Sequence, residues 1–267
     1  MSRPQVVAHR GASEDVAEHT LASYRRALDD GADALECDVR LTRDGHLVCV
    51  HDRRLERTSD GRGVLSTKRL EELAALDWDT RRSAWADLDD EAEPPDHNAG
   101  KILTLHDLLA MVHDWHRPVQ VAIETKHPVR YSGWVEQRLV QTLASFGWAQ
   151  PVYGAEVPVR VMSFSVMSLS RLRRMAPAVS RVLLVKSDVP AAMRAGRLPP
   201  GVTTVGLQRR LVRAHPRWVG RLQERGNAVH VWVVNDLADV DLCTELGVEA
   251  LITDRPRAVR AHLERST

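Results

Sequence analysis

The stretch ALECDVRLTRDGHLVCVH, residues 34–51, decides the fold of this chain. Its first part alternates, so Glu36 and Asp38 share one face of a predicted strand and apolar residues share the other. The pair Asp44-Gly45 predicts a tight turn, because glycine readily takes the positive φ that such turns need. Residues 47–51 therefore return antiparallel as a hairpin, since a parallel return needs a dozen or more residues.

The turn also predicts which residues of the hairpin face each other. If Arg43 and His46 close the turn, continuing the pairing outward places Asp38 directly opposite His51. We therefore expect the hairpin to return His51 to the carboxylates.

The rest of the chain alternates between strand and helix patterns. With the returning strand set aside, eight apolar runs remain, at residues 6–9, 34–39, 119–125, 159–164, 181–185, 203–207, 229–234 and 250–253. Helical patterns separate nearly all of them, at residues 21–29, 104–115, 134–146, 168–175, 191–196, 217–225 and 239–246. An alternation of this kind over about 250 residues predicts a TIM (β/α)8 barrel, whose active site lies at the carboxyl ends of the strands. His9, Asp38 and Glu124 fall at such ends.

Residues 53–101 interrupt this alternation. The segment is polar and irregular, with a short helical pattern at 68–76 and an acidic, proline-bearing stretch at 87–96. An insertion this long at a barrel mouth is usually a lid or a substrate-side subdomain. We expect one domain over residues 1–267 that carries this insertion. Four arginines near His51 either attract an anionic substrate or are solvated surface charges: Arg53, Arg54, Arg57 and Arg62.

Composition excludes several classes of protein. The 267 residues are 43% hydrophobic, enough for one large core, and the net charge of +1 argues against a nucleic-acid partner. Cys37, Cys49 and Cys243 cannot all pair, and two lie in predicted strands, so we expect no disulfide framework. The first residues enter a strand without an apolar signal region, and no run is long enough to span a bilayer. We expect a soluble, cytoplasmic protein with no stable membrane insertion; the sequence leaves the oligomeric state open.

The first 52 residues hold side chains suited to phosphoester chemistry. His9 and His51 can exchange protons near neutral pH, and Arg10 can hold an oxyanion. The carboxylates of Glu36 and Asp38 can hold a hard cation, and ligation by oxygen alone favours Mg²⁺ or Ca²⁺ over zinc. The pattern predicts metal-assisted hydrolysis of a phosphoester.

The motifs and their order add a family resemblance to this reading. They are His9-Arg10-Gly11, Glu18-His19-Thr20, Gly31-Ala32-Asp33, Glu36-Cys37-Asp38-Val39, Thr42-Arg43-Asp44-Gly45, His51-Asp52, Glu124-Thr125-Lys126, Ser163-Phe164, Trp232-Val233-Val234-Asn235 and Thr253-Asp254-Arg255-Pro256. Over nearly the whole barrel the chain resembles the glycerophosphodiester phosphodiesterases. The resemblance implies a TIM barrel that uses one divalent cation to hydrolyse glycerophosphodiesters, a small-molecule substrate, to glycerol 3-phosphate and an alcohol.

The resemblance also implies roles for single residues. It makes His9 and His51 the acid and the base, and Arg10 a ligand of the phosphate. It assigns the metal to three carboxylates, which are Glu36, Asp38 and Glu124. It leaves open which histidine is the base, and whether the nucleophile is water or the glycerol 2-hydroxyl.

Other positions have two interpretations. Glu124 is either a metal ligand, which we prefer, or only an ion-pair partner of Lys126 on the same face of the strand. In the preferred reading Lys126 lies near the phosphate. Phe164 and Trp232 are assigned to the substrate pocket, although such aromatic residues belong as often to a barrel core.

The chain departs from the family pattern in places. Many relatives have Pro-Glu-Asn-Thr where this chain has Ala17-Glu18-His19-Thr20, a segment whose expected role is to start a helix. Val233 replaces the usual threonine after the late tryptophan, and Leu103 stands where a proline is common. We expect little effect on the chemistry.

Two other functions remain as alternatives. A related barrel could act on lysophospholipids as a phospholipase D, and the polar character of residues 53–101 counts against this. A catalytically inactive barrel could serve as a binding protein. That reading predicts a missing histidine or ligand, and none is missing.

Overall fold

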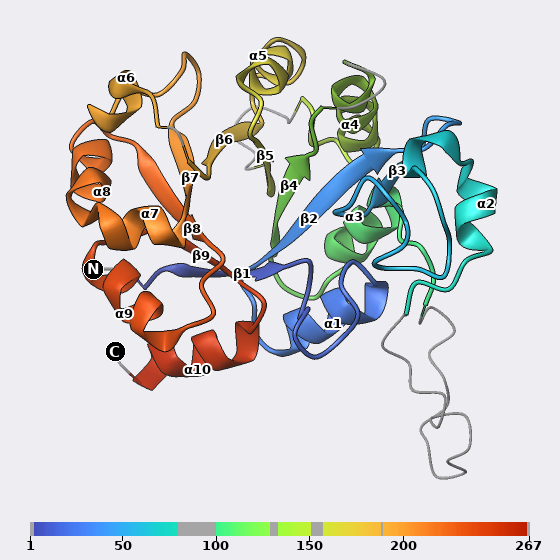
Figure 1. Cartoon of the computed structure of the whole chain (residues 1–267), viewed down its shortest axis with the longest axis horizontal. Helices are drawn as coiled ribbons and strands as arrows, with labels where there is room; N and C mark the ends of the chain where they lie inside the picture. The colour runs from blue at the N-terminus through green and yellow to red at the C-terminus, as the bar shows by residue number, and fades with distance from the viewer. Residues whose placement is uncertain (1–2, 80–99, 129–132, 151–156, 188, 266–267) are drawn as a thin grey trace.

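The computed structural model describes residues 3–79, 100–128, 133–150, 157–187 and 189–265. Its strands form one sheet in the order β1-β9-β8-β7-β6-β5-β4-β2-β3, and β1 also pairs with β2, so the sheet closes into a barrel (Figure 1). The barrel strands all pair in parallel: β1 Gln5–His9, β2 Ala34–Leu41, β4 Gln120–Thr125, β5 Val159–Ser163, β6 Ser180–Val185, β7 Thr204–Gln208, β8 Ala228–Trp232 and β9 Ala250–Thr253. The predicted TIM barrel is confirmed.

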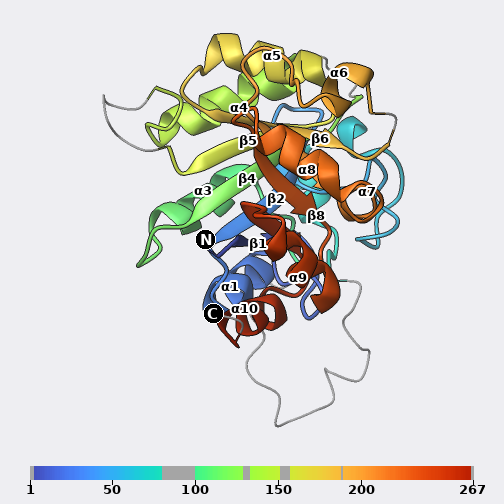
Figure 2. The same ribbon diagram turned by 90° about the vertical axis from the view of Figure 1, so that its left-hand side faces the viewer.

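Helices surround the barrel, as the two views together show (Figures 1 and 2). They are α1 Leu21–Asp29, α2 Leu70–Ala74, α3 Leu105–His113, α4 Trp134–Ser145, α5 Val166–Met175, α6 Ala191–Arg194, α7 Arg209–Ala214, α8 Pro216–Gln223, α9 Leu237–Glu245 and α10 Pro256–Arg265. The sequence patterns missed α7 and α10. The six residues of α7 are too few to show a helical period. Helix α10 begins at a proline, a common first helical residue, so the sequence did carry a signal for its start.

Two apolar layers hold the barrel together. Inside it, small and branched side chains pack against the indole of Trp232: Val7, Ala34, Ala122, Met162, Val182, Leu184, Ala250 and Ile252. Outside it, the opposite faces of the same strands pack under the helices. Side chains alternate along a strand, so a residue two positions after an inner apolar residue also points into the barrel. At the carboxyl ends of the strands, such residues face the barrel mouth.

The hairpin after β2 is present, but its predicted register was wrong by one residue. Strand β3, Leu47–Cys49, pairs antiparallel with the end of β2, with Leu41 opposite Leu47. Thr42 and His46 close the turn, and Gly45 has a φ of +89°. This three-residue loop, which ends in a left-handed glycine, shifts the pairing relative to a two-residue turn.

The shift changes which residue meets Asp38. The Val50 amide donates to the Asp38 carbonyl at 2.9 Å, so Val50 and not His51 lies beside it. His51 is the second residue after β3, and its side chain still lines the cavity at the barrel mouth.

The described part of the inserted segment has regular structure and a small core of its own. Between the hairpin and α3 the chain forms a 3-10 turn, Leu65–Thr67, and the helix α2. These pack on β3 through their own apolar cluster of Val48, Val50, Leu55, Leu65, Leu73 and Trp78. The acidic stretch at 87–96 lies outside the described residues.

Candidate active site

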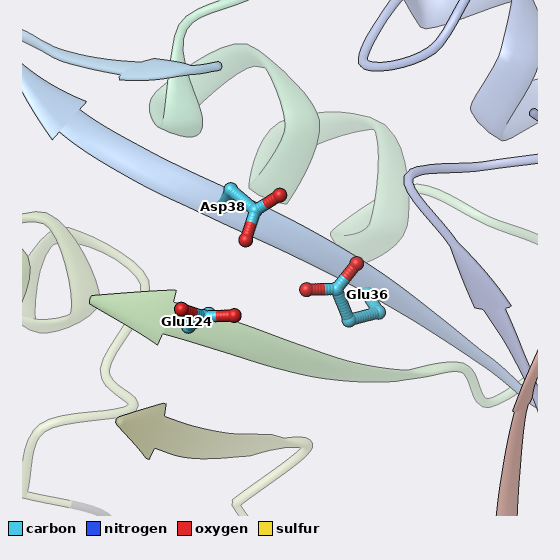
Figure 3. A group of neighbouring side chains, drawn as sticks. All are labelled: Glu36, Asp38 and Glu124. Atoms are coloured by element: carbon cyan, nitrogen blue, oxygen red, sulfur yellow. The ribbon is translucent and has the colours of Figure 1, made fainter. Parts of the chain in front are cut away.

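Three buried carboxylates meet at the carboxyl ends of two neighbouring strands. Glu36 and Asp38 alternate along β2, and Asp38 pairs in register with Glu124 on β4. Figure 3 shows the three side chains turned toward one another on the same side of the two strands. One oxygen from each lies within 4.8 Å of the others, and each residue is at most 7% exposed.

Cations surround Asp38, the most central of these carboxylates. Lys126 Nζ lies 2.8 Å from Asp38 Oδ1, and Arg10 Nε lies 3.2 Å from Oδ2. His19 Nε2 lies 3.0 Å from the same Oδ2. Burial alone would raise the pKa of Asp38, but the hydrogen bond from His19 and the charges on Lys126 and Arg10 hold it well below its usual range.

The negative charges of the other two carboxylates, Glu36 and Glu124, are not fully neutralised by neighbouring cations. Burial, with the charges on Asp38 and Glu124, raises the pKa of Glu36 well above its usual range. Burial and Asp38 raise the pKa of Glu124 to about 7. Lys126 Nζ lies 2.7 Å from Glu124 Oε1, so the alternative ion pair does form, and Lys126 joins Glu124 to Asp38. Lys126 and Arg10 cannot neutralise three carboxylates, because Arg10 also pairs with Glu18, so the cluster suits a hard divalent cation held by oxygen ligands.

His9 stands at the end of β1 with its ring fixed by an acid. His9 Nδ1 lies 2.6 Å from Asp254 Oδ1, just beyond the end of β9. Ser13 and Asn235 also donate to the Asp254 carboxylate, at 2.9 and 2.6 Å. Burial opposes ionisation, but the hydrogen bond and charge of His9 lower the pKa of Asp254 well below its usual range. The ionised Asp254 leaves His9 Nε2 free for chemistry.

His51 has the same arrangement on the hairpin. Its Nδ1 lies 2.7 Å from Asp52 Oδ1, and Asp52 is in turn paired with Arg57. Burial, with the positive charges of Lys126 and Arg10 nearby, lowers the pKa of His51 to about 4. His51 is therefore neutral near pH 7 and can accept a proton.

His19 is a site residue that the sequence analysis treated only as part of a helix entry. It is 5% exposed, and its Nδ1 lies 2.8 Å from the Tyr24 hydroxyl while its Nε2 contacts Asp38. Its φ is +60°, which turns the side chain back from the loop into the barrel. The signal available in sequence was the polar residue just before the Thr20 helix cap.

A cavity of about 360 Å³ opens beside these groups and is lined by two different walls. One wall is charged and comprises His9, Arg10, Glu36, His51, Glu124 and Lys126. The other is mainly apolar and comprises Met162, Phe164, Leu184, Lys186, Trp232, Val233 and Ile252. Phe164 and Trp232 meet edge to face, with ring centroids 5.6 Å apart.

The structure thus brings most of the predicted site residues to one cavity. Asp38 lies behind it, in contact with Arg10 and Lys126, and Phe164 is 45% exposed at its rim. Of the arginines in the insertion, Arg57 is tied to Asp52 and Glu18, whereas Arg54 pairs with Glu56. Asp254 was quoted only as part of a motif, and Lys186 was not foreseen.

Within the described residues, no helix is both long and apolar enough to cross a membrane. The three cysteines are free thiols, and all are buried.

Residues 9–258 match the glycerophosphoryl diester phosphodiesterase family. A Mycobacterium tuberculosis protein named "Probable glycerophosphodiester phosphodiesterase 1" is 45% identical, over 98% of this chain and 93% of its own. A glycerophosphodiester phosphodiesterase of Bacillus subtilis is 30% identical, over 94% of this chain and 83% of its own.

Solved structures share the fold. A glycerophosphodiester phosphodiesterase from Agrobacterium tumefaciens superposes with a TM-score of 0.74 at 23% identity, over 97% of this chain and 99% of its own. An Oleispira antarctica phosphodiesterase, solved in complex with the product sn-glycerol-3-phosphate, superposes with a TM-score of 0.74 at 23% identity, over 98% of this chain and 97% of its own. With a family match over nearly its whole length and a relative at 45% identity, this chain belongs to the glycerophosphoryl diester phosphodiesterase family.

Proposed function

We propose that this protein hydrolyses glycerophosphodiesters to glycerol 3-phosphate and an alcohol, with one divalent cation, Mg²⁺ or Ca²⁺. The observation that carries the proposal is the pair of imidazoles at one cavity, each held at Nδ1 by a carboxylate. Two such groups beside a cluster of buried carboxylates suit the transfer of two protons around a phosphate. The product named for the Oleispira relative is the one that this reaction would release.

The cation would be held by Glu36, Asp38 and Glu124. Their oxygens lie close enough to share one ion. Burial, and then repulsion from the neighbouring carboxylates, raises the pKa values of Glu36 and Glu124, and a bound cation would offset both effects. When bound, the cation would neutralise the negative charge that develops on the phosphate. Lys126, already between two of these carboxylates, adds a fixed positive charge on the same side.

The chain's own residues account for the proton transfers. Arg10, held by Glu18 and Asp38, presents a rigid guanidinium to a phosphate oxygen. His51, neutral because its pKa is near 4, takes the proton of the attacking hydroxyl as the new O–P bond forms. The nucleophile is water or the neighbouring glycerol hydroxyl, and in either case this proton goes to His51. His9, whose Nδ1 is held by Asp254, gives its proton to the alkoxide as the P–O bond to the alcohol breaks.

A lysophospholipid is the second candidate substrate. Val166 and Met167, on the first turn of α5, are 47% and 65% exposed, and they follow closely after Phe164, which lines the cavity. This apolar surface gives an acyl chain a place to lie, which the polar sequence of the insertion did not suggest.

The test compares glycerophosphocholine, glycerophosphoethanolamine and a lysophosphatidylcholine side by side, with Mg²⁺, with Ca²⁺ and with excess chelator. We expect release of glycerol 3-phosphate from the first two substrates, and only with the cation. His9→Ala and His51→Ala should each lower kcat by roughly 10²–10⁴-fold with the fold intact, and the double variant should be little worse. Full turnover in chelator, or no turnover of any diester, would reject the proposal; cleavage of the lysophospholipid alone would favour the second candidate.

A further inference from the structure

One positively charged side chain, Lys186, lines the cavity outside the charged wall. Lys186 directly follows β6 and lies on the apolar wall, exposed at its outer end. In the order of the barrel, β6 is four strands from β1 in either direction. Lys186 therefore faces His9 and Arg10 from the far side of the mouth, where a substrate whose phosphate lies near β1 and β2 would place its outer end.

The apolar wall below Lys186 is continuous. Leu184 and Lys186 are two residues apart and both line the cavity, so they share the inner face of the strand and its extension. At Gly206 on β7, an added Cβ would lie 2.6 Å from Leu184 and 3.6 Å from Trp232, so these two side chains meet over the glycine. The Trp232 indole donates to the Gly206 carbonyl at 2.9 Å and packs against Phe164.

Lys186 differs from the other cations at the cavity in its partners. Arg10 is paired with Glu18 and Asp38, and Lys126 with Asp38 and Glu124. No carboxylate among the described residues pairs with Lys186. Its charge is therefore available to a bound molecule.

We propose that Lys186 sets the charge preference for the alcohol part of the substrate, disfavouring cationic head groups and favouring polyol or anionic ones. This inference rests on the proposed function. An aromatic pair such as Phe164 and Trp232 would by itself attract a quaternary ammonium through its ring faces. A positive charge at the same wall opposes that attraction, because like charges in a partly shielded cavity repel.

The experiment measures kcat/KM for glycerophosphocholine and for glycerophosphoinositol, which carry a cationic and a neutral polyol head group. The readout is the ratio of the two values in wild type, Lys186→Met and Lys186→Glu. Methionine keeps the length of the side chain and removes its charge, whereas glutamate reverses the charge. We expect the preference for the polyol to fall about tenfold in Lys186→Met, mainly because the choline substrate improves, and to fall further in Lys186→Glu.

Lys68→Met is the matched control, because Lys68 lies on the inserted segment, pairs with Glu72, and its loss changes the net charge equally. Its ratio should equal that of wild type. In wild type the preference should also shrink in 1 M salt, where the screening length falls to about 3 Å. An unchanged ratio in both Lys186 variants, with wild type active, would overturn the inference alone. A wild type that cleaves no diester would overturn the proposed function and this inference with it.

Discussion

His51 shows at the scale of one residue how the fold sets a chemical property. A histidine has an ordinary pKa of about 6.5 and would be partly charged at pH 7. Here burial, together with Lys126 and Arg10, removes that charge despite the neighbouring Asp52. The same imidazole on an open loop would be mostly protonated at mildly acidic pH and could not accept a proton there.

The pKa of His51 can be measured directly. In a proton NMR titration of the metal-free protein, the His51 ring signal, assigned by its loss in His51→Gln, should titrate with a midpoint near pH 4. Because the unfolded chain binds this proton near pH 6.5, His51 stabilises the folded state less and less as the pH falls from 6.5 toward 4. An ordinary midpoint near 6.5 would contradict the burial argument.

His19 links backbone strain to the carboxylate cluster. Its φ of +60° is unfavourable for most residues, tolerable for asparagine and worst for β-branched side chains. The loop keeps this conformation while the imidazole joins Tyr24 to Asp38.

We expect His19→Asn and His19→Val to separate the two effects. Both variants remove the imidazole, and valine resists a positive φ more than asparagine does, so the valine variant should be less stable by at least about 1–2 kcal/mol. Urea denaturation of both proteins gives the two free energies of unfolding. Equal values would show that the loop relaxes and that the positive φ carries no cost.

At the scale of elements, the hairpin of β2 and β3 delivers one of the two histidines. The turn places Gly45 at φ +89°, and the ladder continues to the contact between Val50 and Asp38. His51 is the next residue, so its position depends on the register set at the turn. The apolar cluster of the insertion then packs on the face of β3 that carries Val48 and Val50.

Changing the turn should therefore change catalysis. Inserting one alanine between Asp44 and Gly45 should shift the register, send His51 to the other face, and lower kcat by at least about a hundredfold, the loss of a positioned base. Gly45→Val should do part of this damage, because a β-branched residue resists a φ of +89°.

The control is an alanine inserted after Gly226, in a turn with open space around it that precedes β8 at the opposite end of the barrel. This variant should keep near-normal kcat, since lengthening an exposed turn costs little closure entropy. If the variant with alanine inserted between Asp44 and Gly45 kept the kcat of this control, His51 would reach the cavity independently of the hairpin.

At the scale of the whole molecule, the carboxylate cluster affects the stability of the barrel. Glu36 and Asp38 belong to β2 and Glu124 to β4, so a cation bound by all three joins two strands that already pair in register. Without it, the repulsion among the carboxylates acts against the folded state.

Thermal unfolding should report this link. At a concentration of Mg²⁺ or Ca²⁺ about 100-fold above its Kd, binding stabilises the folded state by roughly 2.7 kcal/mol, which raises the Tm by about 5–10 °C for a chain of this size. Glu36→Gln keeps the shape but loses one ligand charge, and should show little of the shift. Sodium chloride at equal ionic strength is the control. An equal shift in both proteins would place the cation elsewhere.

Much of the fold could be read from local patterns. Each barrel strand fell within a residue or two of a predicted apolar run, because burial on both faces produces a continuous apolar stretch. The direction of the hairpin followed from the shortness of its loop. The register did not, because Thr42-His46 and Arg43-His46 closures are both compatible with the same Asp44-Gly45 pair.

The sequence by itself determined which residue types stand at the strand ends, and so the kind of chemistry to expect. Only the tertiary structure decided how those residues are paired and charged. Asp254 reaches His9 across 245 residues because β9 pairs with β1 to close the barrel. Lys186 faces the charged wall for the same reason, since β6 lies opposite β1. The spacing of apolar residues in the sequence indicates which face of each segment is buried. Contacts between distant strand ends form only when the barrel closes, and the pKa values depend on those contacts.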